Sequence, residues 1–371
     1  MTRALGVTWA LLAGCEPIAP LDTAAPVEPG SMLTTVTSAE NANEDGTVLV
    51  TVDVDDATTA FLVTATGSDT ARLALEEIRD PSGKVVLDAN DWGFGPNTLT
   101  DAFFPTGPQT VSQWPIRPED GPLSPGKWKV EFSSTDDGGP VDVTTLSKAD
   151  FDFSTGVVDA QIVWAQGVDQ EPGVQEAVEV AVERWRAIWA DIGITLRESY
   201  RKSDIDPDLD LYPLGSAGVL ASAENGTGHS VQVIIGELVS GQNFLYGVAA
   251  GIPGTVVPSE ETFVLVSWLT HAGFDGTFDN YEEKRILGET LAHEIGHFMG
   301  LAHPVEQGWG QHDALGDTDE CSSMSSCQTL LGSNLMFPYP VCTGYPATDC
   351  TPQGDLSGDQ LGVLNRYTAT L

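Results

Sequence analysis

Three features are scarce or absent in this 371-residue sequence, and each narrows what the protein can be. Only 16 Lys and Arg stand against 54 Asp and Glu, which gives a net charge of −38. So acidic a chain is repelled by nucleic acid and by anionic membrane surfaces, and we expect neither as a partner. No apolar run is long enough to span a membrane. Cysteine is absent between Cys15 and Cys321, so any disulfide within the folded chain has to lie near its carboxyl end.

The segment from Leu291 to His303 contains the most informative pattern, H-E-x-x-H-x-x-G-x-x-H. Residues four apart on a helix lie on one face, so His293 and His297 can bind one metal ion, with Glu294 beside them. His303 can join them only if the chain turns, and Gly300 can adopt the left-handed conformation that ends a helix. Three neutral imidazoles leave one tetrahedral position open, which predicts a catalytic zinc site. Isolated helical histidines are more often ordinary polar residues, but the five fixed positions together favour the metal site.

The amino terminus has the layout of an export signal. A mostly apolar stretch from Ala4 to Ala13 ends in Leu12-Ala-Gly-Cys15. Residues 1–15 resemble a bacterial lipoprotein signal, which implies that Cys15 receives a lipid and anchors the chain in a bilayer. The implied location is the cell envelope, at the outer membrane or cell surface, or outside the cell if the signal is not used in this way. An ordinary signal peptide is the alternative, and the Pro- and Ala-rich residues 16–31 are interpreted as an extended tether.

The remaining four cysteines lie close together near the carboxyl end. An exported protein favours disulfides, and four cysteines can form two of them. The sequence does not determine the pairing, although neighbouring cysteines are the simplest partners. A structural zinc site is the alternative, but the usual C-x-x-C pairs are missing. These cysteines are Cys321, Cys327, Cys342 and Cys350.

Residues 32–155 have a β pattern. Turn sequences such as Asp80-Pro-Ser-Gly83 separate short runs rich in β-branched or alternating residues, at 47–54, 60–66, 72–78, 84–87 and 127–132. Short strands without helices predict an all-β sandwich. The segment has no cluster of catalytic residue types, so we expect an accessory domain that folds by itself rather than an inhibitory prodomain. A chain beginning near Gly156 should then keep its activity.

The pattern changes at residue 156, and 156–371 is predicted to be one α+β domain with a mixed sheet. Apolar residues recur at helical spacing over 173–192 and 281–299, the second helix being capped by Asp279 or Asn280. Strands are expected at 159–164, 194–199, 230–235 and 262–269. The second helix carries the proposed zinc ligands.

This order of elements and the histidine motif together resemble the metzincins, a clan of zinc peptidases. The resemblance implies a catalytic cleft below a mixed sheet and a tight turn under the zinc, whose methionine matches Met336 in Asn334-Leu-Met-Phe-Pro338. Residues 246–253 resemble the cleft-lining edge strand of the pappalysins, whereas the methionine turn resembles that of the matrixins. Several families of the clan place a tyrosine two residues after the methionine, but here Tyr339 comes one residue later. A carboxyl-terminal helix is expected at 356–364.

Two further groups of residues have weaker signals. Carboxylates suit calcium, so an acidic loop after the motif predicts either a calcium site or a solvated loop; its residues are Asp313, Asp317, Asp319 and Glu320. The other histidines, His229, His271 and His312, lack partner spacing and are interpreted as ordinary polar residues.

The sequence therefore predicts a zinc-dependent endopeptidase that acts on protein or peptide substrates, with Glu294 as general base. A thermolysin-like enzyme would use a downstream glutamate instead of His303. The alternative from another functional class is an envelope-anchored binding or adhesion protein with a non-catalytic protease fold. Such proteins usually lack a ligand or the base, and this sequence has all four residues.

Overall fold

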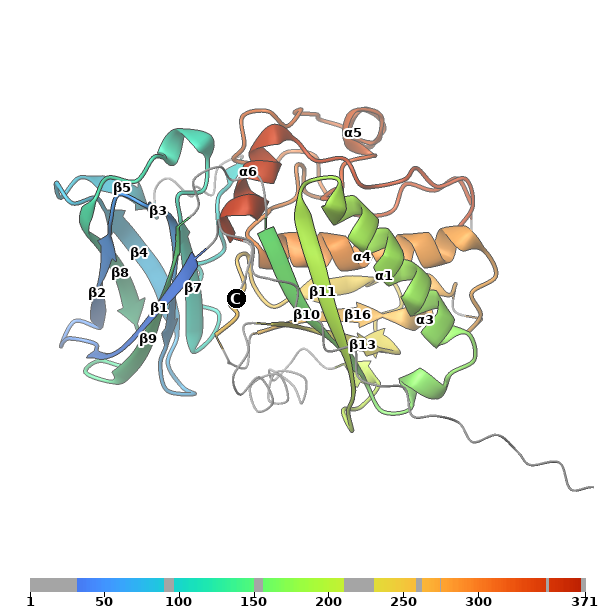
Figure 1. Cartoon of the computed structure of the whole chain (residues 1–371), viewed down its shortest axis with the longest axis horizontal. Helices are drawn as coiled ribbons and strands as arrows, with labels where there is room; N and C mark the ends of the chain where they lie inside the picture. Colours follow the sequence, from blue (N-terminus) through green and yellow to red (C-terminus); the bar gives the residue numbers. More distant parts are fainter. Residues whose placement is uncertain are drawn as a thin grey trace, which may run out of the picture.

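The computed structural model describes residues 32–89, 97–149, 156–209, 230–257, 262–273, 275–344 and 347–367. These residues form two parts that lie side by side, a β part up to residue 149 and a sheet-and-helix part from Gly156 onward (Figure 1). Cys15, the proposed tether and His229 lie outside the described residues. Within the described residues, no helix combines the length and apolar character needed to cross a membrane.

The β part consists of two four-stranded antiparallel sheets. One has the order β1(Met32–Asn41), β9(Pro140–Ala149), β3(Thr58–Thr66), β7(Gln109–Trp114). The other has the order β2(Thr47–Val54), β8(Gly126–Ser134), β4(Leu73–Arg79), β5(Val85–Asp88). In β2 every second residue from Val48 is buried, because successive side chains of a strand point to opposite faces. These residues pack against the other sheet in one apolar core.

Strand β7 has no alternation, because all six of its residues are buried. The sequence Gln-Thr-Val-Ser-Gln-Trp gave no strand signal, and its polar side chains Gln109, Ser112 and Gln113 are nevertheless enclosed. One reason is that Gln113 reaches the sheet-and-helix part at Gly300. Strands β1 and β9 were also absent from the sequence expectation.

The sheet-and-helix part contains a five-stranded mixed sheet in the order β11-β10-β13-β16-β15. The strands are β10(Gly156–Trp164), β11(Ile194–Lys202), β13(Val231–Gly236), β15(Gly247–Ala249) and β16(Phe263–Ser267). All neighbours pair in parallel except β15, which is antiparallel to β16 and forms an edge of the sheet. The expected α+β class with a mixed sheet is confirmed. The strand predicted over 262–269 is shorter, because Trp268–His271 forms the short helix α3.

Two long helices, α1(Val174–Ala190) and α4(Tyr281–Phe298), cross each other closely. A Cβ atom on Gly288 would lie 2.4 Å from the Ala181 carbonyl oxygen, so only glycine permits this approach. Beside the crossing, the Glu289 carboxylate accepts hydrogen bonds from Arg184 of α1 and from Arg285 of α4. This buried ion pair network holds α4 in a defined rotation against α1.

Shorter elements complete the carboxyl-terminal region. Helix α5(Met324–Leu331) was not predicted, and α6(Gly358–Tyr367) replaces the helix expected at 356–364. Two-residue strands also form: β12(Asp208–Leu209) pairs with β14(Leu238–Val239), and β17(His312–Asp313) with β6(Asn97–Thr98) of the β part. Two 3-10 helices lie at Pro118–Asp120 and Val168–Gln170.

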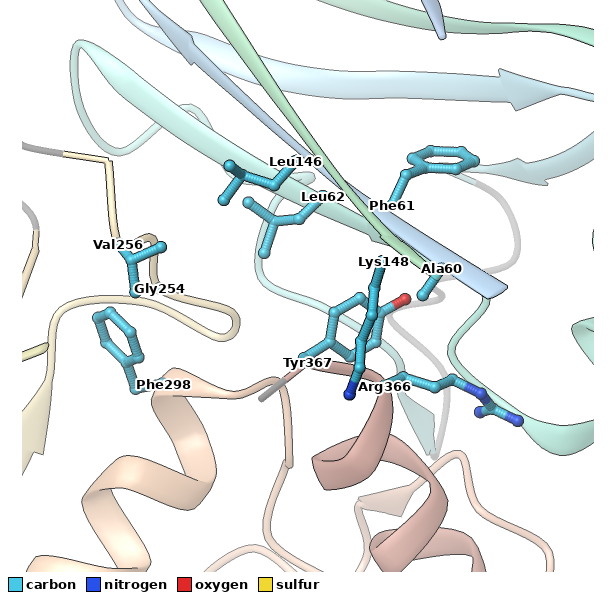
Figure 2. A pocket seen from close by; sticks show the side chains of 10 residues that line it. All are labelled: Ala60, Phe61, Leu62, Leu146, Lys148, Gly254, Val256, Phe298, Arg366 and Tyr367. Carbon is cyan, nitrogen blue, oxygen red and sulfur yellow. The ribbon is translucent and has the colours of Figure 1, made fainter. Parts of the chain in front are cut away.

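The two parts share a tightly packed junction. Ala60 and Leu146 of the β part belong to the apolar core of the sheet-and-helix part. Figure 2 shows both side chains facing a pocket with Phe298, at the end of α4, and Tyr367 of α6. The Tyr367 hydroxyl donates to the Pro115 carbonyl oxygen. The β part is therefore packed against the ends of α4 and α6.

Candidate metal centre

Helix α4 positions two of the three predicted zinc ligands. Its amino terminus is fixed by Asn280, whose side chain accepts a hydrogen bond from the Glu283 amide while the Glu283 carboxylate accepts one from the Asn280 amide. Of the two caps that the sequence allowed, Asn280 is the one used. Five residues before its end the helix carries His293, followed by His297 one turn later, and both project from one face.

The turn after α4 brings in the third histidine. The Gly300 amide donates to the His297 carbonyl oxygen at 2.8 Å, and the Leu301 amide donates to the Gly296 carbonyl oxygen at 2.9 Å. This pair of bonds is a Schellman motif, which requires positive φ at Gly300, and the observed φ is +100°. A Cβ atom there would also lie 2.2 Å from Nε2 of Gln113 in the β part. Glycine is therefore required at position 300 because φ is positive there and because a Cβ atom would not fit beside Gln113.

The three histidines converge on one point. The distance between the Nε2 atoms of His297 and His303 is 3.1 Å, and that between His303 and His293 is 3.3 Å. Each Nδ1 has an oxygen partner: Leu335 O at 2.8 Å from His293, Leu301 O at 2.6 Å from His297, and the Glu306 carboxylate at 3.0 Å from His303. An oxygen acceptor places the proton on Nδ1, which leaves the lone pair of Nε2 free.

This arrangement fits a metal ion. Three unprotonated nitrogens facing one another repel unless a cation lies between them. A tetrahedral zinc with ligands at about 2.0 to 2.1 Å separates its nitrogen atoms by about 3.3 Å, close to the observed spacing. Among the described residues, these histidines are the only group of His, Cys, Asp or Glu close enough to hold one ion. Burial also lowers the pKa of His293 to about 3, with a smaller effect from His303, which favours the neutral form that metals bind.

Glu294 lies beside the histidines and against the edge strand. Its carboxylate accepts a hydrogen bond from the Ala249 amide of β15, and its Cγ atom would lie only 2.7 Å from a Cβ atom placed on Gly247. Burial raises the pKa of Glu294 to about 8. A dication held by the neighbouring histidines would oppose that shift, since it stabilises the carboxylate. The carboxyl group is thus fixed in position and able to take up a proton near neutral pH.

Met336 lies in the turn beneath α4. Its side chain is fully buried, and its sulfur would lie 2.6 Å from a Cβ atom on Gly296. The turn is held by Asn334, whose Oδ1 accepts from the Met336 amide at 2.9 Å and whose Nδ2 donates to Gln360 of α6. The neighbouring Leu335 carbonyl orients His293, so the turn also acts on the ligands.

Sequence reasoning missed two residues of the site. Glu306 orients His303, and the only sequence signal was its position three residues after a ligand. Asn334 belongs to the methionine segment, but the sequence predicted no role for it, although it links the turn to α6. Tyr339 is turned elsewhere: its ring packs against Trp309 and Phe337, and its hydroxyl accepts a hydrogen bond from Gln328 at 3.4 Å.

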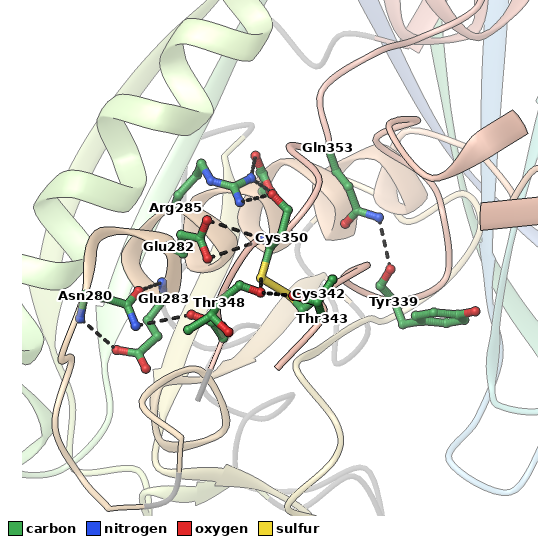
Figure 3. The surroundings of a disulfide bond; sticks show 12 residues. Asn280, Glu282, Glu283, Arg285, Tyr339, Cys342, Thr343, Thr348, Cys350 and Gln353 are labelled. Carbon is green, nitrogen blue, oxygen red and sulfur yellow. Dashed lines mark hydrogen bonds and ion pairs between the residues drawn. A yellow bond between two sulfur atoms is a disulfide. The ribbon is translucent and has the colours of Figure 1, made fainter. Parts of the chain in front are cut away.

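Both disulfides join neighbouring cysteines. The pairs are Cys321–Cys327 and Cys342–Cys350, which excludes the alternative of a four-cysteine zinc site. Figure 3 shows the second disulfide docked on the first half of α4. The Cys350 amide faces the Glu282 carboxylate at 3.4 Å, and Nη2 of Arg285 donates to the Cys350 carbonyl oxygen at 3.1 Å.

The acidic loop does not assemble into a calcium site. Asp313 is buried and accepts hydrogen bonds from Thr318 and the Leu315 amide, whereas Asp317, Asp319 and Glu320 are exposed. Within the described residues these carboxylates do not converge as a metal site would require. The calcium expectation thus has no support in the structure.

Two other histidines have structural contacts. The two ring nitrogens of His271 lie 2.5 Å from the Ser267 carbonyl oxygen and 2.9 Å from the Thr290 hydroxyl of α4. His312 has Nε2 at 3.1 Å from the Cys321 carbonyl oxygen. Both fit the interpretation as ordinary polar residues.

No protein-family profile and no curated protein matches the chain. Among solved structures, archaemetzincin from Methanopyrus kandleri superposes with a TM-score of 0.29 at 16% identity, over 57% of this chain and 87% of that chain. Metalloproteinase-II from Bacteroides fragilis gives 0.28 at 12% identity, over 46% and 57% of the two chains. The SPBc2 prophage-derived protein YomS gives 0.19 at 15% identity, over 32% and 96%. At these TM-scores the similarity carries no argument about function.

Proposed function

We propose that this chain is a zinc-dependent endopeptidase of the metzincin clan, with His293, His297 and His303 as ligands and Glu294 as general base. The observation that carries the proposal is the convergence of three Nε2 atoms, each freed by an oxygen partner on Nδ1, beside a buried carboxyl group. Zinc bound there would supply a Lewis acid and an acidified water molecule. The Schellman turn at Gly300 and the buried Met336 support placement in the clan. Residues 246–253 favour a pappalysin-like enzyme, and the methionine turn favours a matrixin-like one.

The residues of the chain divide the remaining work. Glu294 takes a proton from the attacking water and passes it to the nitrogen of the leaving amine, so the peptide bond is exchanged for a carboxyl group and an amine. The hydrogen bond from Ala249 keeps its carboxylate next to the edge strand. An extended peptide can pair with the open side of β15. Any bond along the length of the peptide can then lie in the cleft and be cleaved. This favours cleavage inside a chain over removal of terminal residues.

A cavity of about 110 Å³ adjoins this strand and suits a substrate side chain. It is lined by Tyr246, which precedes β15, by Ile286 of α4, and by Pro340, which follows the methionine turn. Ile286 lies seven residues before His293 and therefore on the same helix face. A peptide antiparallel to β15 runs toward Tyr246, so the cavity would receive a residue on the carboxyl side of the cleaved bond.

The test compares wild type with Glu294→Gln, using zinc analysis and digestion of a peptide library. The variant should keep one zinc per chain and lose roughly 10²- to 10⁴-fold in kcat, because the ligands remain and the base is gone. A matched control is Glu179→Gln on the exposed face of α1, which should behave as wild type. A Glu294→Gln variant that cleaves normally would show that the base is wrong. A wild type that binds zinc but cleaves nothing would favour the binding or adhesion protein.

The location of the protein is a further part of the proposal. Leu12-Ala-Gly-Cys15 supports a lipidated Cys15 that holds the enzyme at the cell envelope. Mass spectrometry of the mature amino terminus tests this, with Cys15→Ser as the comparison. A mature chain that begins at an unmodified residue elsewhere would contradict it.

A further inference from the structure

The segment 250–257 follows the edge strand β15 in the chain and contacts the end of the metal-bearing helix α4. At its start the Ala250 amide donates to the Phe263 carbonyl oxygen of β16 at 3.1 Å. Further along, the Gly254 amide donates to the Phe298 carbonyl oxygen of α4 at 2.9 Å. Between these two points, the hydrogen-bond partners of the Ile252 backbone lie outside the sheet-and-helix part.

Those partners are residues of the β part. The Asp101 carboxylate accepts from the Ile252 amide, with oxygen distances of 3.0 and 3.2 Å. The Ile252 carbonyl oxygen in turn accepts from the Asp101 amide at 3.2 Å and from the Thr100 hydroxyl at 3.0 Å. Both backbone polar groups of Ile252 are therefore satisfied by the β part. Asp101 is half-buried at the junction, and its burial raises the pKa of the carboxyl group to about 7.

A second contact lies three residues further on. The hydroxyls of Thr64 in β3 and Thr255 are 2.8 Å apart and buried. Together with Asp101 and Thr100, this contact fixes the middle of segment 250–257 to the β part rather than to its own sheet. The path of the segment is thus determined across the junction.

A shift of Ile252 can reach the base Glu294 through a short stretch of backbone. Only two residues separate Ile252 from Ala249, whose amide donates to Glu294. A shift of Ile252 would therefore alter both the hydrogen bond to Glu294 and the strand available to a peptide. No residue of the β part needs to touch the substrate for this to occur.

We propose that Asp101 is a positioning residue of the catalytic site, which holds segment 250–257 so that β15 and Glu294 keep their geometry. The proposal rests on the proposed function and extends it, because it makes the β part a fixed component of the enzyme. It also revises the expectation that a chain beginning near Gly156 would keep full activity. Without the β part, Ile252 loses the partners of both its amide and its carbonyl group.

The experiment measures Asp101→Ala in the full chain, with Asp56→Ala as a control at an exposed position of the β part. Four quantities are compared: zinc content, KM and kcat on a peptide substrate, and amide hydrogen exchange of residues 247–257. We expect zinc to stay at one per chain and KM to rise roughly tenfold or more, with a smaller change in kcat, since the hydrogen bonds from the Ile252 amide to Asp101 are lost. Exchange at Ala249 and Ile252 should accelerate at least roughly tenfold.

Asp101→Asn serves as a graded second variant, because it keeps one oxygen that can accept from Ile252. It should shift KM and exchange in the same direction but less, and it decides the question if Asp101→Ala does not fold. Unchanged exchange and unchanged KM in the variants would overturn the proposal, as would equal effects in Asp56→Ala. Higher activity on weakening the junction would also overturn it, since that result marks an inhibitory prodomain. If wild type shows no peptidase activity, the proposed function fails, while hydrogen exchange still decides whether Asp101 positions the segment.

Discussion

Glu306 offers the sharpest test of how the metal site is built. Of the three ligands, His293 and His297 are oriented by backbone carbonyls, and only His303 depends on a side chain. The Glu306 backbone is held independently, because its amide donates to the Gln311 carbonyl oxygen at 2.8 Å. Replacing the side chain should therefore remove the orienting carboxylate without unfolding the turn.

The size of the effect follows from what the carboxylate does. It fixes the tautomer and ring angle of one ligand in three, and loss of such a partner typically costs 10- to 100-fold in metal affinity. This corresponds to about 1.4 to 2.7 kcal/mol in binding free energy. Glu306→Ala should approach the upper end, whereas Glu306→Gln, whose amide oxygen can still accept from Nδ1, should stay near the lower end.

Competition for zinc against a chelating dye at neutral pH measures this directly. Glu320→Ala, an exposed carboxylate in the same region, serves as the control and should bind zinc as wild type does. Unfolding of the metal-free proteins should be nearly the same, because the Glu306 side chain is 37% exposed and contributes little to the core. If Glu306→Ala retained wild-type zinc affinity, the reasoning about ligand orientation would be refuted.

Three further predictions concern stability. Gly300→Ala should lower the free energy of unfolding, measured with urea, by at least about 1 to 2 kcal/mol because of the positive φ alone. The added Cβ atom would also clash with the Gln113 side chain, so Gln113→Ala in the Gly300→Ala background should recover that second part of the loss. Met336→Ala should cost about 2 to 5 kcal/mol in a thermal melt, because a fully buried side chain leaves a cavity beside Gly296. Burial lowers the pKa of His271 to about 4 from an ordinary 6.5, so the metal-free protein should lose on the order of 3 kcal/mol as pH falls from about 6.5 to 4. The variant His271→Gln should lack this part of the pH dependence, and an unchanged slope would contradict the assignment.

The local features of this protein can be predicted from its sequence. Helix α4 and the spacing of His293 and His297 follow from interactions within a few residues, and the sequence limited the cap to Asp279 or Asn280. The same holds for the turn at Gly300. For the cysteines the sequence only favoured neighbouring partners, and the structure establishes the pairs. Such features are readable because backbone geometry and short loops leave few alternatives.

Features that depend on distant partners follow only from the packing of the folded chain. The strand β7 had no sequence pattern, since both of its faces are buried and Gln113 faces Gly300 of the other part. Ala249 meets Glu294 across 45 positions of sequence, and Asp101 meets Ile252 across 151. Hydrogen bonds of this kind produce no periodic pattern in the amino-acid sequence, because they depend on how sheets and helices pack and not on neighbouring residues. The motif thus specified which residues form the metal site, and packing between the two parts determined what holds that site in shape.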